Sequence, residues 1–155
     1  MNKNLKARIN AMSKEQLIGL IEQMCAVADS EQLLRLMLTP TKASIDHALY
    51  RLSVRCEIYV GDSCNERDRR AMFKAAEPLY AAYQYADDKM GAYIIYGMHK
   101  AMDENDLIDS GGGEDYYAIV GELLGDLKSI LEHSPELFSK EEFEAYSSII
   151  ELDET

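Results

Sequence analysis

The sequence predicts an all-α protein of about eight helices, packed as stacked antiparallel helical hairpins in a single domain over residues 1–155. Apolar residues recur three and four positions apart along almost the whole chain, which is the spacing of one helix face. No segment sustains the alternation of apolar and polar residues that is typical of a half-buried strand. The connections between the expected helices are mostly short, and short connections make consecutive helices pack antiparallel.

The N-terminal part of the chain predicts two helices. Residues 4–12 carry apolar side chains at helical spacing and form the first. Ser13 and Gln16 match a capping box, in which each side chain binds a free backbone N–H, and they begin a second helix that extends to about Ala28. We expect the wide apolar stripe of this second helix to be buried on most of one side.

Two helices are expected between residue 29 and Asp62. The first is short and ends at Thr39-Pro40, because the residue before a proline is disfavoured in the helical region. Thr41 then caps a long helix whose apolar residues follow helical spacing from Ile45 to Tyr59. Gly61-Asp62 closes it.

Two more helices precede the acidic part of the chain. Asn65 caps a helix that extends to about Tyr85, and Pro78 inside it predicts a kink or a break one turn earlier. Asp87 or Asp88 caps the next helix, which extends to about Met102 and places a second set of tyrosines close to the first.

A long loop is expected over residues 103–117, with the sequence DENDLIDSGGGEDYY. Three consecutive glycines have a large backbone-entropy cost in a helix, so this stretch favours a loop. A leucine-rich helix follows over residues 114–133, and Ser134-Pro135 ends it. Ser139 and Glu142 match a second capping box and begin the last helix.

The charge is concentrated at one end of the chain. The net charge is −12, and residues 101–155 contain sixteen Asp and Glu against only Lys128 and Lys140. Direct binding of nucleic acid by this acidic C-terminal third is therefore not expected, because phosphate contacts need cations. The basic cluster of Arg67, Arg69, Arg70 and Lys74 predicts a solvated face or an internal partner for the acidic third; a contact to an acidic partner or to nucleic acid is the alternative.

The residue types that support catalysis do not form a complete set, so we expect no catalytic residues, no metal site and no cofactor. The three cysteines are widely spaced without a zinc pattern, which indicates a reduced, intracellular protein. His47, His99 and His133 lie on separate helices as surface or half-buried residues. The N-terminus has no secretory signal pattern and no apolar stretch is long enough to span a membrane, so a cytoplasmic location is expected.

The acidic loop has three interpretations. Asp103, Asn105, Asp109 and Glu114 fit part of a calcium-binding frame, but Leu107 occupies a position that requires an oxygen ligand. A phosphate site before the following helix is disfavoured because the neighbouring carboxylates repel it. A solvated connection or a partner-contact site remains, with negative charge in the first turn of the following helix stabilising the helix dipole.

Four stretches of the chain resemble one protein family. They are SKEQLIGLIEQM, DHALYRLSVRC, AAYQYADDKMGAYIIYGMHKAM and LIDSGGGEDYYAIVGELLGDL. Together, over residues 13–131, they resemble the helical region of bacterial SWIM zinc-finger-containing proteins and their relatives of unknown function. The resemblance implies a helical array with no assigned chemistry. The zinc finger of that family has no counterpart here, so its role does not transfer.

These observations predict a non-catalytic protein–protein interaction module that acts through tyrosine-rich helix surfaces and the acidic loop. The expected partner is a protein, with a basic protein as one option, or a second copy of the chain. A tyrosine-rich core layer is the competing interpretation of the tyrosines. The alternative function is an acidic nucleic-acid mimic that blocks a basic DNA- or RNA-binding protein. The expected partner-binding residues are Asp103, Asp106, Asp109, Glu114, Asp115, Tyr116, Tyr93 and Tyr96.

Overall fold

The structure is a computed structural model that describes residues 3–27 and 39–153. Within these ranges the chain forms seven α-helices and no strand, which confirms the all-α prediction. The expected short helix before Pro40 lies almost wholly outside the described residues. The helices are α1 Lys3–Asn10, α2 Lys14–Val27, α4 Lys42–Gly61, α5 Glu66–Gln84, α6 Asp88–Asp103, α7 Gly113–His133 and α8 Lys140–Asp153.

The chain divides into two compact units, residues 1–39 and residues 40–155. The expectation of a single domain therefore stays a prediction. In the first unit the structure confirms the capping box that the sequence predicts. The Ser13 N–H donates to Gln16 Oε1 over 2.9 Å, and the Gln16 N–H donates to Ser13 Oγ over 3.2 Å. These two bonds fix the start of α2.

Part of the apolar face of α2 is exposed within the described residues of the first unit. Ile18, Ile21 and Met24 are 47%, 41% and 47% exposed. The other described helix of this unit, α1, has only eight residues and three basic side chains. Because α1 offers so little apolar surface, it leaves these three residues exposed within the first unit, and the expected burial of this face stays a prediction.

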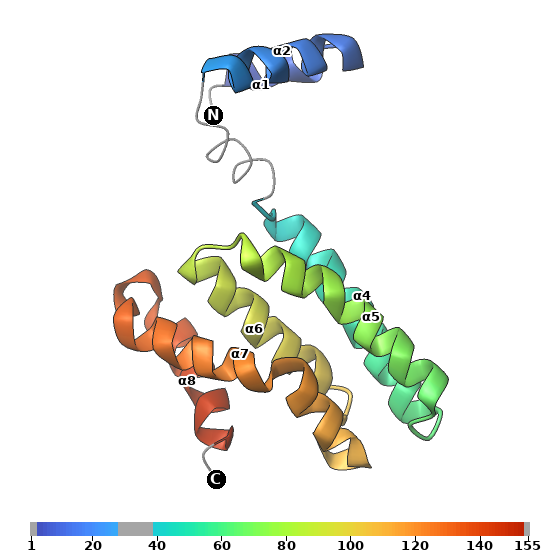
Figure 1. Cartoon of the computed structure of the whole chain (residues 1–155). Helices are drawn as coiled ribbons and strands as arrows, with labels where there is room; N and C mark the ends of the chain where they lie inside the picture. Colours follow the sequence, from blue (N-terminus) through green and yellow to red (C-terminus); the bar gives the residue numbers. More distant parts are fainter. Residues whose placement is uncertain (1–2, 28–38, 154–155) are drawn as a thin grey trace. The chain divides into compact units, whose positions relative to one another are not determined.

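The second unit is a helical bundle built on the α4–α5 hairpin. The two helices lie side by side; α6 packs against α4, α7 against α6, and α8 against α7 (Figure 1). Each of these helices contributes apolar side chains to one core. The largest fully buried side chains are Ile45, Leu52, Met72, Leu79, Ile94, Ile95, Met98, Met102, Leu107, Val120, Leu124 and Leu127.

The helix starts in this unit follow the predicted capping residues. Thr41, Asn65 and Asp87 are the N-caps of α4, α5 and α6, and each side chain accepts a bond from a backbone N–H of the first turn. Ser139 and Glu142 form the second predicted capping box, with bonds of 2.8 and 3.1 Å. These residues satisfy backbone donors that have no partner within the helix.

Pro78 does not break α5. The helix continues from Glu66 to Gln84 with the proline inside it, so the alternative of a break one turn earlier is wrong. Pro78 has no N–H, so the Lys74 carbonyl one turn earlier lacks its helical donor. Both residues lie on the exposed side of the helix. Solvent can therefore hydrate the group that the proline leaves without a donor.

The connection between α6 and α7 is much shorter than the predicted loop. After a turn, residues Ile108–Gly112 form a π-helical turn, and α7 begins at Gly113. Of the three glycines only Gly111 has a positive φ, of 93°. Leu107 is fully buried and its carbonyl accepts the Gly112 N–H over 3.0 Å, so core packing draws this segment into helical structure.

No described helix combines the length and the apolar character needed to cross a membrane.

Candidate functional site

Tyr93 and Tyr96, two of the expected partner-binding residues, lie on one groove between α4 and α6. The groove has a volume of about 360 Å³. Gly97 lets the Leu49 side chain pack closely on the α6 backbone, because a Cβ there would stand only 2.5 Å from Leu49 Cδ1. We call this surface the Tyr-lined groove; its residues are Leu49, Tyr50, Ser53, Tyr93, Tyr96, Gly97, Lys100, Ala101 and Glu104.

The two half-buried tyrosines of the groove are held in place by neighbouring helices. The Tyr93 hydroxyl donates to Asp46 on α4, and this bond, with burial, raises the pKa of Tyr93. Asp46 also accepts from Lys42 Nζ over 2.7 Å, which lowers the pKa of the carboxyl. The Tyr96 ring lies 4.8 Å from the Tyr146 ring of α8. Both rings are therefore pre-organised before any partner binds.

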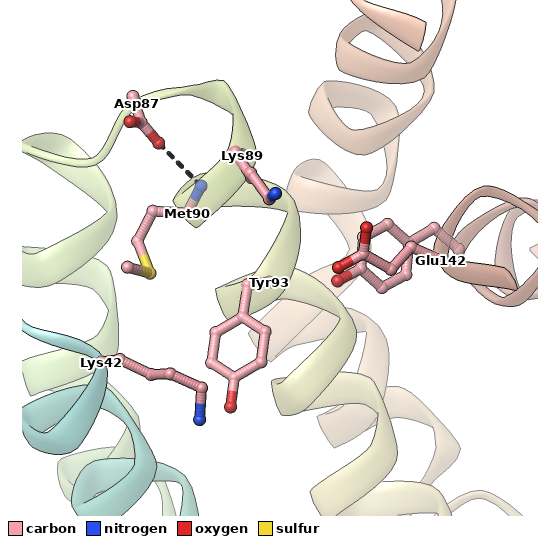
Figure 2. A pocket seen from close by; sticks show the side chains of 7 residues that line it. Lys42, Asp87, Lys89, Met90, Tyr93 and Glu142 are labelled. Carbon is pink, nitrogen blue, oxygen red and sulfur yellow. Dashed lines mark hydrogen bonds between the residues drawn. The ribbon is translucent and has the colours of Figure 1, made fainter. Parts of the chain in front are cut away.

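A second hollow shares Tyr93 with the Tyr-lined groove and lies at the N-terminal end of α6 (Figure 2). Its volume is about 280 Å³ and its surface is mainly apolar; Met90, Tyr93 and Tyr146 line it together with Lys42, Lys89, Asp87 and Glu142. Lys42 Nζ lies 5.2 Å from the centre of the Tyr93 ring, a cation–π contact. Aromatic and aliphatic surface thus continues along α6, with two cations and two carboxylates at this end.

The opposite end of the Tyr-lined groove leads into the acidic turn. Glu104 lines the groove and pairs with Lys100 over 3.4 Å. The turn is fixed by Asn105, whose amide donates to Ser53 Oγ over 2.9 Å and to the Ala101 carbonyl over 2.6 Å. The expected contact residues that are exposed on this turn and the start of α7 are Asp103, Asp106, Asp109 and Glu114.

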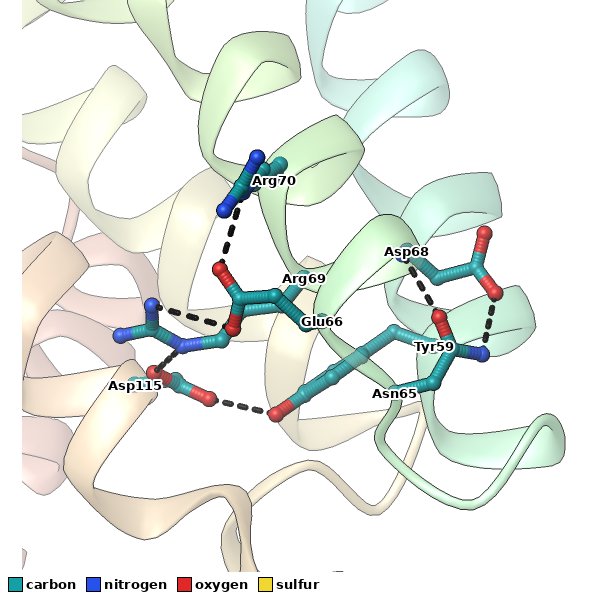
Figure 3. Close-up of polar contacts among 7 residues, drawn as sticks. All are labelled: Tyr59, Asn65, Glu66, Asp68, Arg69, Arg70 and Asp115. Carbon is teal, nitrogen blue, oxygen red and sulfur yellow. Dashed lines mark hydrogen bonds and ion pairs between the residues drawn. The ribbon is translucent and has the colours of Figure 1, made fainter.

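Asp115 is also an expected contact residue, but it is buried, at 6% exposure, and its carboxylate is occupied (Figure 3). It accepts the Tyr59 hydroxyl of α4 over 2.7 Å and the Arg69 Nε–H of α5 over 2.7 Å. One carboxylate therefore joins three helices. Asp115 does not form part of an exposed surface, because the first turn of α7 places it against the α4–α5 hairpin.

Tyr116, too, is buried instead of exposed. Its hydroxyl lies 2.8 Å from Nδ1 of His99, and its ring packs edge-on against the His99 ring at 5.7 Å. His99 is itself only 6% exposed, so its expected surface or half-buried position is wrong. Burial lowers the pKa of His99, while Asp103 on the same helix opposes this effect.

The buried imidazole predicts that stability falls in mild acid. Because the folded pKa of His99 lies below the unfolded value of about 6.5, its contribution to stability is complete above that pH and is lost as the pH falls through the folded pKa. We expect the unfolding free energy of the wild type to fall more than that of His99→Gln between about pH 7.5 and pH 5.5. Urea unfolding at both pH values measures this. An equal fall in both proteins would contradict it.

The other tyrosines separate into internal and exposed groups. The Tyr80 hydroxyl donates to the Ile119 carbonyl over 2.5 Å, and the Tyr83 hydroxyl donates to Asp126 over 2.9 Å. Both bonds run from α5 to α7, and burial raises the pKa of Tyr83 to about 12. Tyr50 is 67% exposed at the Tyr-lined groove. The core-layer interpretation therefore describes the buried Tyr59 and Tyr116; Tyr80 and Tyr83 are half-buried, while Tyr50, Tyr93 and Tyr96 border a surface groove.

The described residues contain no group of three or more His, Cys, Asp or Glu side chains arranged to hold a metal ion. Cys56 is buried, which raises the pKa of its thiol to about 12 and disfavours the reactive thiolate. Cys64 is half-buried and free. The predicted basic cluster is divided: Arg69 binds Asp115 of the acidic third, and Arg70 pairs with Glu66 over 2.9 Å.

Comparisons of the chain with protein-family models, with curated proteins and with solved structures found no match. The resemblance to the helical region of SWIM zinc-finger-containing proteins stays a prediction.

Sequence reasoning missed Tyr50, Asp46 and Tyr146 as parts of this surface. Tyr50 directly follows the apolar residues Ala48 and Leu49 in α4, so its exposure has no signal in the helical pattern alone. Asp46 and Tyr146 act through contacts with α6 from segments far away in sequence. Only the packing of α4 and α8 against α6 reveals them.

Proposed function

We propose that the protein is a non-catalytic interaction module that binds a protein partner through the Tyr-lined groove. The observation that carries the proposal is the juxtaposition of exposed Tyr50 with Tyr93 and Tyr96, which are half-buried and held by Asp46 and Tyr146. Tyrosines contribute large contact area at low conformational-entropy cost and are enriched among the residues that dominate binding energy. Rings that are already fixed lose little further freedom when a partner binds.

The charges at the two ends of α6 indicate how the partner is arranged. The N-terminal end of α6 carries Lys42 and Lys89 together with Asp87 and Glu142, so its charges balance, whereas the C-terminal end carries Asp103, Glu104 and Asp106 against Lys100. The sixteen residues of α6 span about 24 Å, enough for about four turns of a partner helix. A helical segment with apolar residues on one face and basic residues at the end near Asp103 complements this surface.

Tyrosine truncation tests the proposal. We expect Tyr96→Ala and Tyr50→Ala each to weaken partner capture from a lysate of the source cells, because losing a central tyrosine costs about 2 kcal/mol of binding. Tyr117→Ala is the matched control, since Tyr117 is 49% exposed on α7, away from the groove. Circular dichroism of each variant verifies folding. Equal capture by wild type and Tyr96→Ala, or an equal loss with Tyr117→Ala, would refute this use of the groove.

A second candidate function is the acidic mimic of nucleic acid. It is supported by the exposure of acidic side chains on α7, α8 and their connections, where Asp115 is the buried exception among the described acids. Glu122 and Asp126 lie one turn apart on α7, about 6 Å along the axis. This candidate predicts a complex with a basic protein that weakens steeply as salt is raised. A complex that is insensitive to salt would count against it.

A further inference from the structure

The outer face of the α4–α5 hairpin carries cations around a hollow of its own. The hollow has a volume of about 400 Å³, and Arg51 and Arg55 of α4 line it together with Lys74 of α5. Ala71 and Ala75 are small, which leaves space between the two helices at this level. Pro78 and Glu77 complete the lining, and Glu77 is its one acidic side chain. Three cations and one carboxylate give this face a net positive charge.

These three cations are not used by the fold. Within the described residues, none of Arg51, Arg55 and Lys74 has a carboxylate within ion-pair distance. The structure pairs many of its other cations, including Lys42 with Asp46 and Arg69 with Asp115. In a chain with a net charge of −12, three exposed and unpaired cations around one hollow form a local field of opposite sign.

An apolar strip runs beside the cations on α4. Tyr50, Val54 and Ile58 follow one another at intervals of four residues, so they share one helix face. They line a separate hollow of about 260 Å³ on α4, which Arg51 and Arg55 also line. Tyr50 is exposed, and Val54 and Ile58 are half-buried. Along about 12 Å of α4 the surface therefore offers apolar contacts on one side of the arginines and a cationic hollow on the other.

We propose that this surface, the Arg51/Arg55 face, is a docking site for an acidic amphipathic peptide segment of a partner protein. Carboxylates of the segment bind Arg51, Arg55 and Lys74, with arginine able to bind a carboxylate through two parallel hydrogen bonds. Apolar side chains of the same segment cover Tyr50, Val54 and Ile58. This binding chemistry differs from that proposed for the Tyr-lined groove, whose partner carries basic residues.

The charge layout favours a peptide over nucleic acid. Nucleic acid carries about one negative charge per 1.7 Å of duplex, so three cations neutralise little of it while the sixteen acids of residues 101–155 repel the remainder. In duplex nucleic acid the bases are stacked inside, so its phosphate backbone also leaves the apolar strip without a complementary surface. A short segment with a few carboxylates and apolar residues matches both parts of the face.

Peptide selection on the whole chain tests the proposal. A library of random peptides of about 16 residues, long enough for about four helical turns, is selected against the wild type and against Arg51→Glu/Arg55→Glu. The control is Arg8→Glu/Arg67→Glu, which changes the net charge by the same amount on other exposed arginines. We expect the wild type and the control to enrich peptides that combine Asp or Glu with apolar residues. The Arg51→Glu/Arg55→Glu variant should lose them.

Fluorescence anisotropy with one enriched acidic peptide gives the size of the effect. We expect Arg51→Glu/Arg55→Glu to weaken binding at least about tenfold and the control to change it less than about twofold. Enrichment of peptides without acidic residues, equal binding by the arginine variant, or tighter binding of a fluorescent single-stranded DNA than of the peptide would overturn the proposal. Sedimentation showing that the wild type self-associates through this face, and that Arg51→Glu/Arg55→Glu does not, would also overturn the proposal. If Arg51→Glu/Arg55→Glu still captures the partner of the Tyr-lined groove and Tyr96→Ala does not, the Arg51/Arg55 face and the Tyr-lined groove are independent binding sites.

Discussion

Asp115→Ala is expected to lower the unfolding free energy by about 3 kcal/mol, because it removes a buried carboxylate that two partners require. The Tyr59 hydroxyl, on a side chain only 4% exposed, is left without its acceptor. Arg69 is 40% exposed in its side chain, so solvent screens the ion pair and keeps the loss at the lower end of the range for buried pairs. Urea unfolding of the two proteins at neutral pH measures this loss.

Tyr59→Phe is the matched control for this network. It keeps the ring and removes only the hydroxyl donor, so we expect a loss of about 1 kcal/mol. The double variant should lose less than the sum of the two single losses, because both changes break the same bond. A loss below about 1 kcal/mol for Asp115→Ala would show that the carboxylate does not connect the helices as described.

Gly112→Ala should lower the unfolding free energy by about 2 kcal/mol through a backbone clash. A Cβ at this position would lie 2.8 Å from the Leu107 carbonyl oxygen and 2.5 Å from Leu107 Cδ1. The carbonyl is fixed by its bond to the Gly112 N–H, and Leu107 is fully buried, so neither has room to move. Thermal and urea unfolding both report the change.

Gly113→Ala provides the internal comparison. Its Cβ would meet only the Ile108 carbonyl at 3.7 Å, an ordinary contact, and Gly113 is the first residue of α7. We expect this variant to be as stable as the wild type or up to about 1 kcal/mol more stable, since alanine favours the helix. Equal destabilisation by both substitutions would mean that the glycines are needed for flexibility and not for the close approach of Leu107.

Helix boundaries were predictable where a local motif determines them. The caps Thr41, Asn65 and Asp87 and the capping boxes at Ser13 and Ser139 depend on residues three positions apart, so the sequence contains the whole signal. The acidic connection was predicted too long for the opposite reason. Its structure depends on Leu107 entering the core, and no local pattern distinguishes a buried leucine in a turn from an exposed one.

The expected contact residues also divide into those whose position a local pattern determines and those whose position depends on helix packing. Tyr93 and Tyr96 lie on one groove, because residues three apart share a helix face. Asp115 and Tyr116 are next to each other in sequence, and both turned out to be internal, since α7 packs against helices whose positions the sequence does not specify. Charge composition predicted that residues 101–155 are acidic, but it did not indicate that Asp115 is the acid that connects the helices.

The structural use of tyrosine explains how an acidic helix packs in this bundle. Tyr59 and Tyr83 donate hydroxyl protons to Asp115 and Asp126 of α7, and Tyr80 donates to a backbone carbonyl of the same helix. A tyrosine hydroxyl satisfies a carboxylate oxygen without adding a charge, and at Asp115 the Arg69 guanidinium supplies the opposite charge. The fold itself therefore accounts for these tyrosines, and we propose partner binding only for Tyr50, Tyr93 and Tyr96 at the Tyr-lined groove.

Site-specific photo-crosslinking tests the proposed use of this groove most directly. A photo-reactive phenylalanine derivative replaces Lys100, which is exposed and lines the Tyr-lined groove, or Tyr117, which is exposed on α7. Irradiation of cells containing each variant should give a covalent adduct with one partner protein at Lys100 and none with that protein at Tyr117. The absence of any adduct at Lys100, or the same adduct at both positions, would contradict partner binding through this groove.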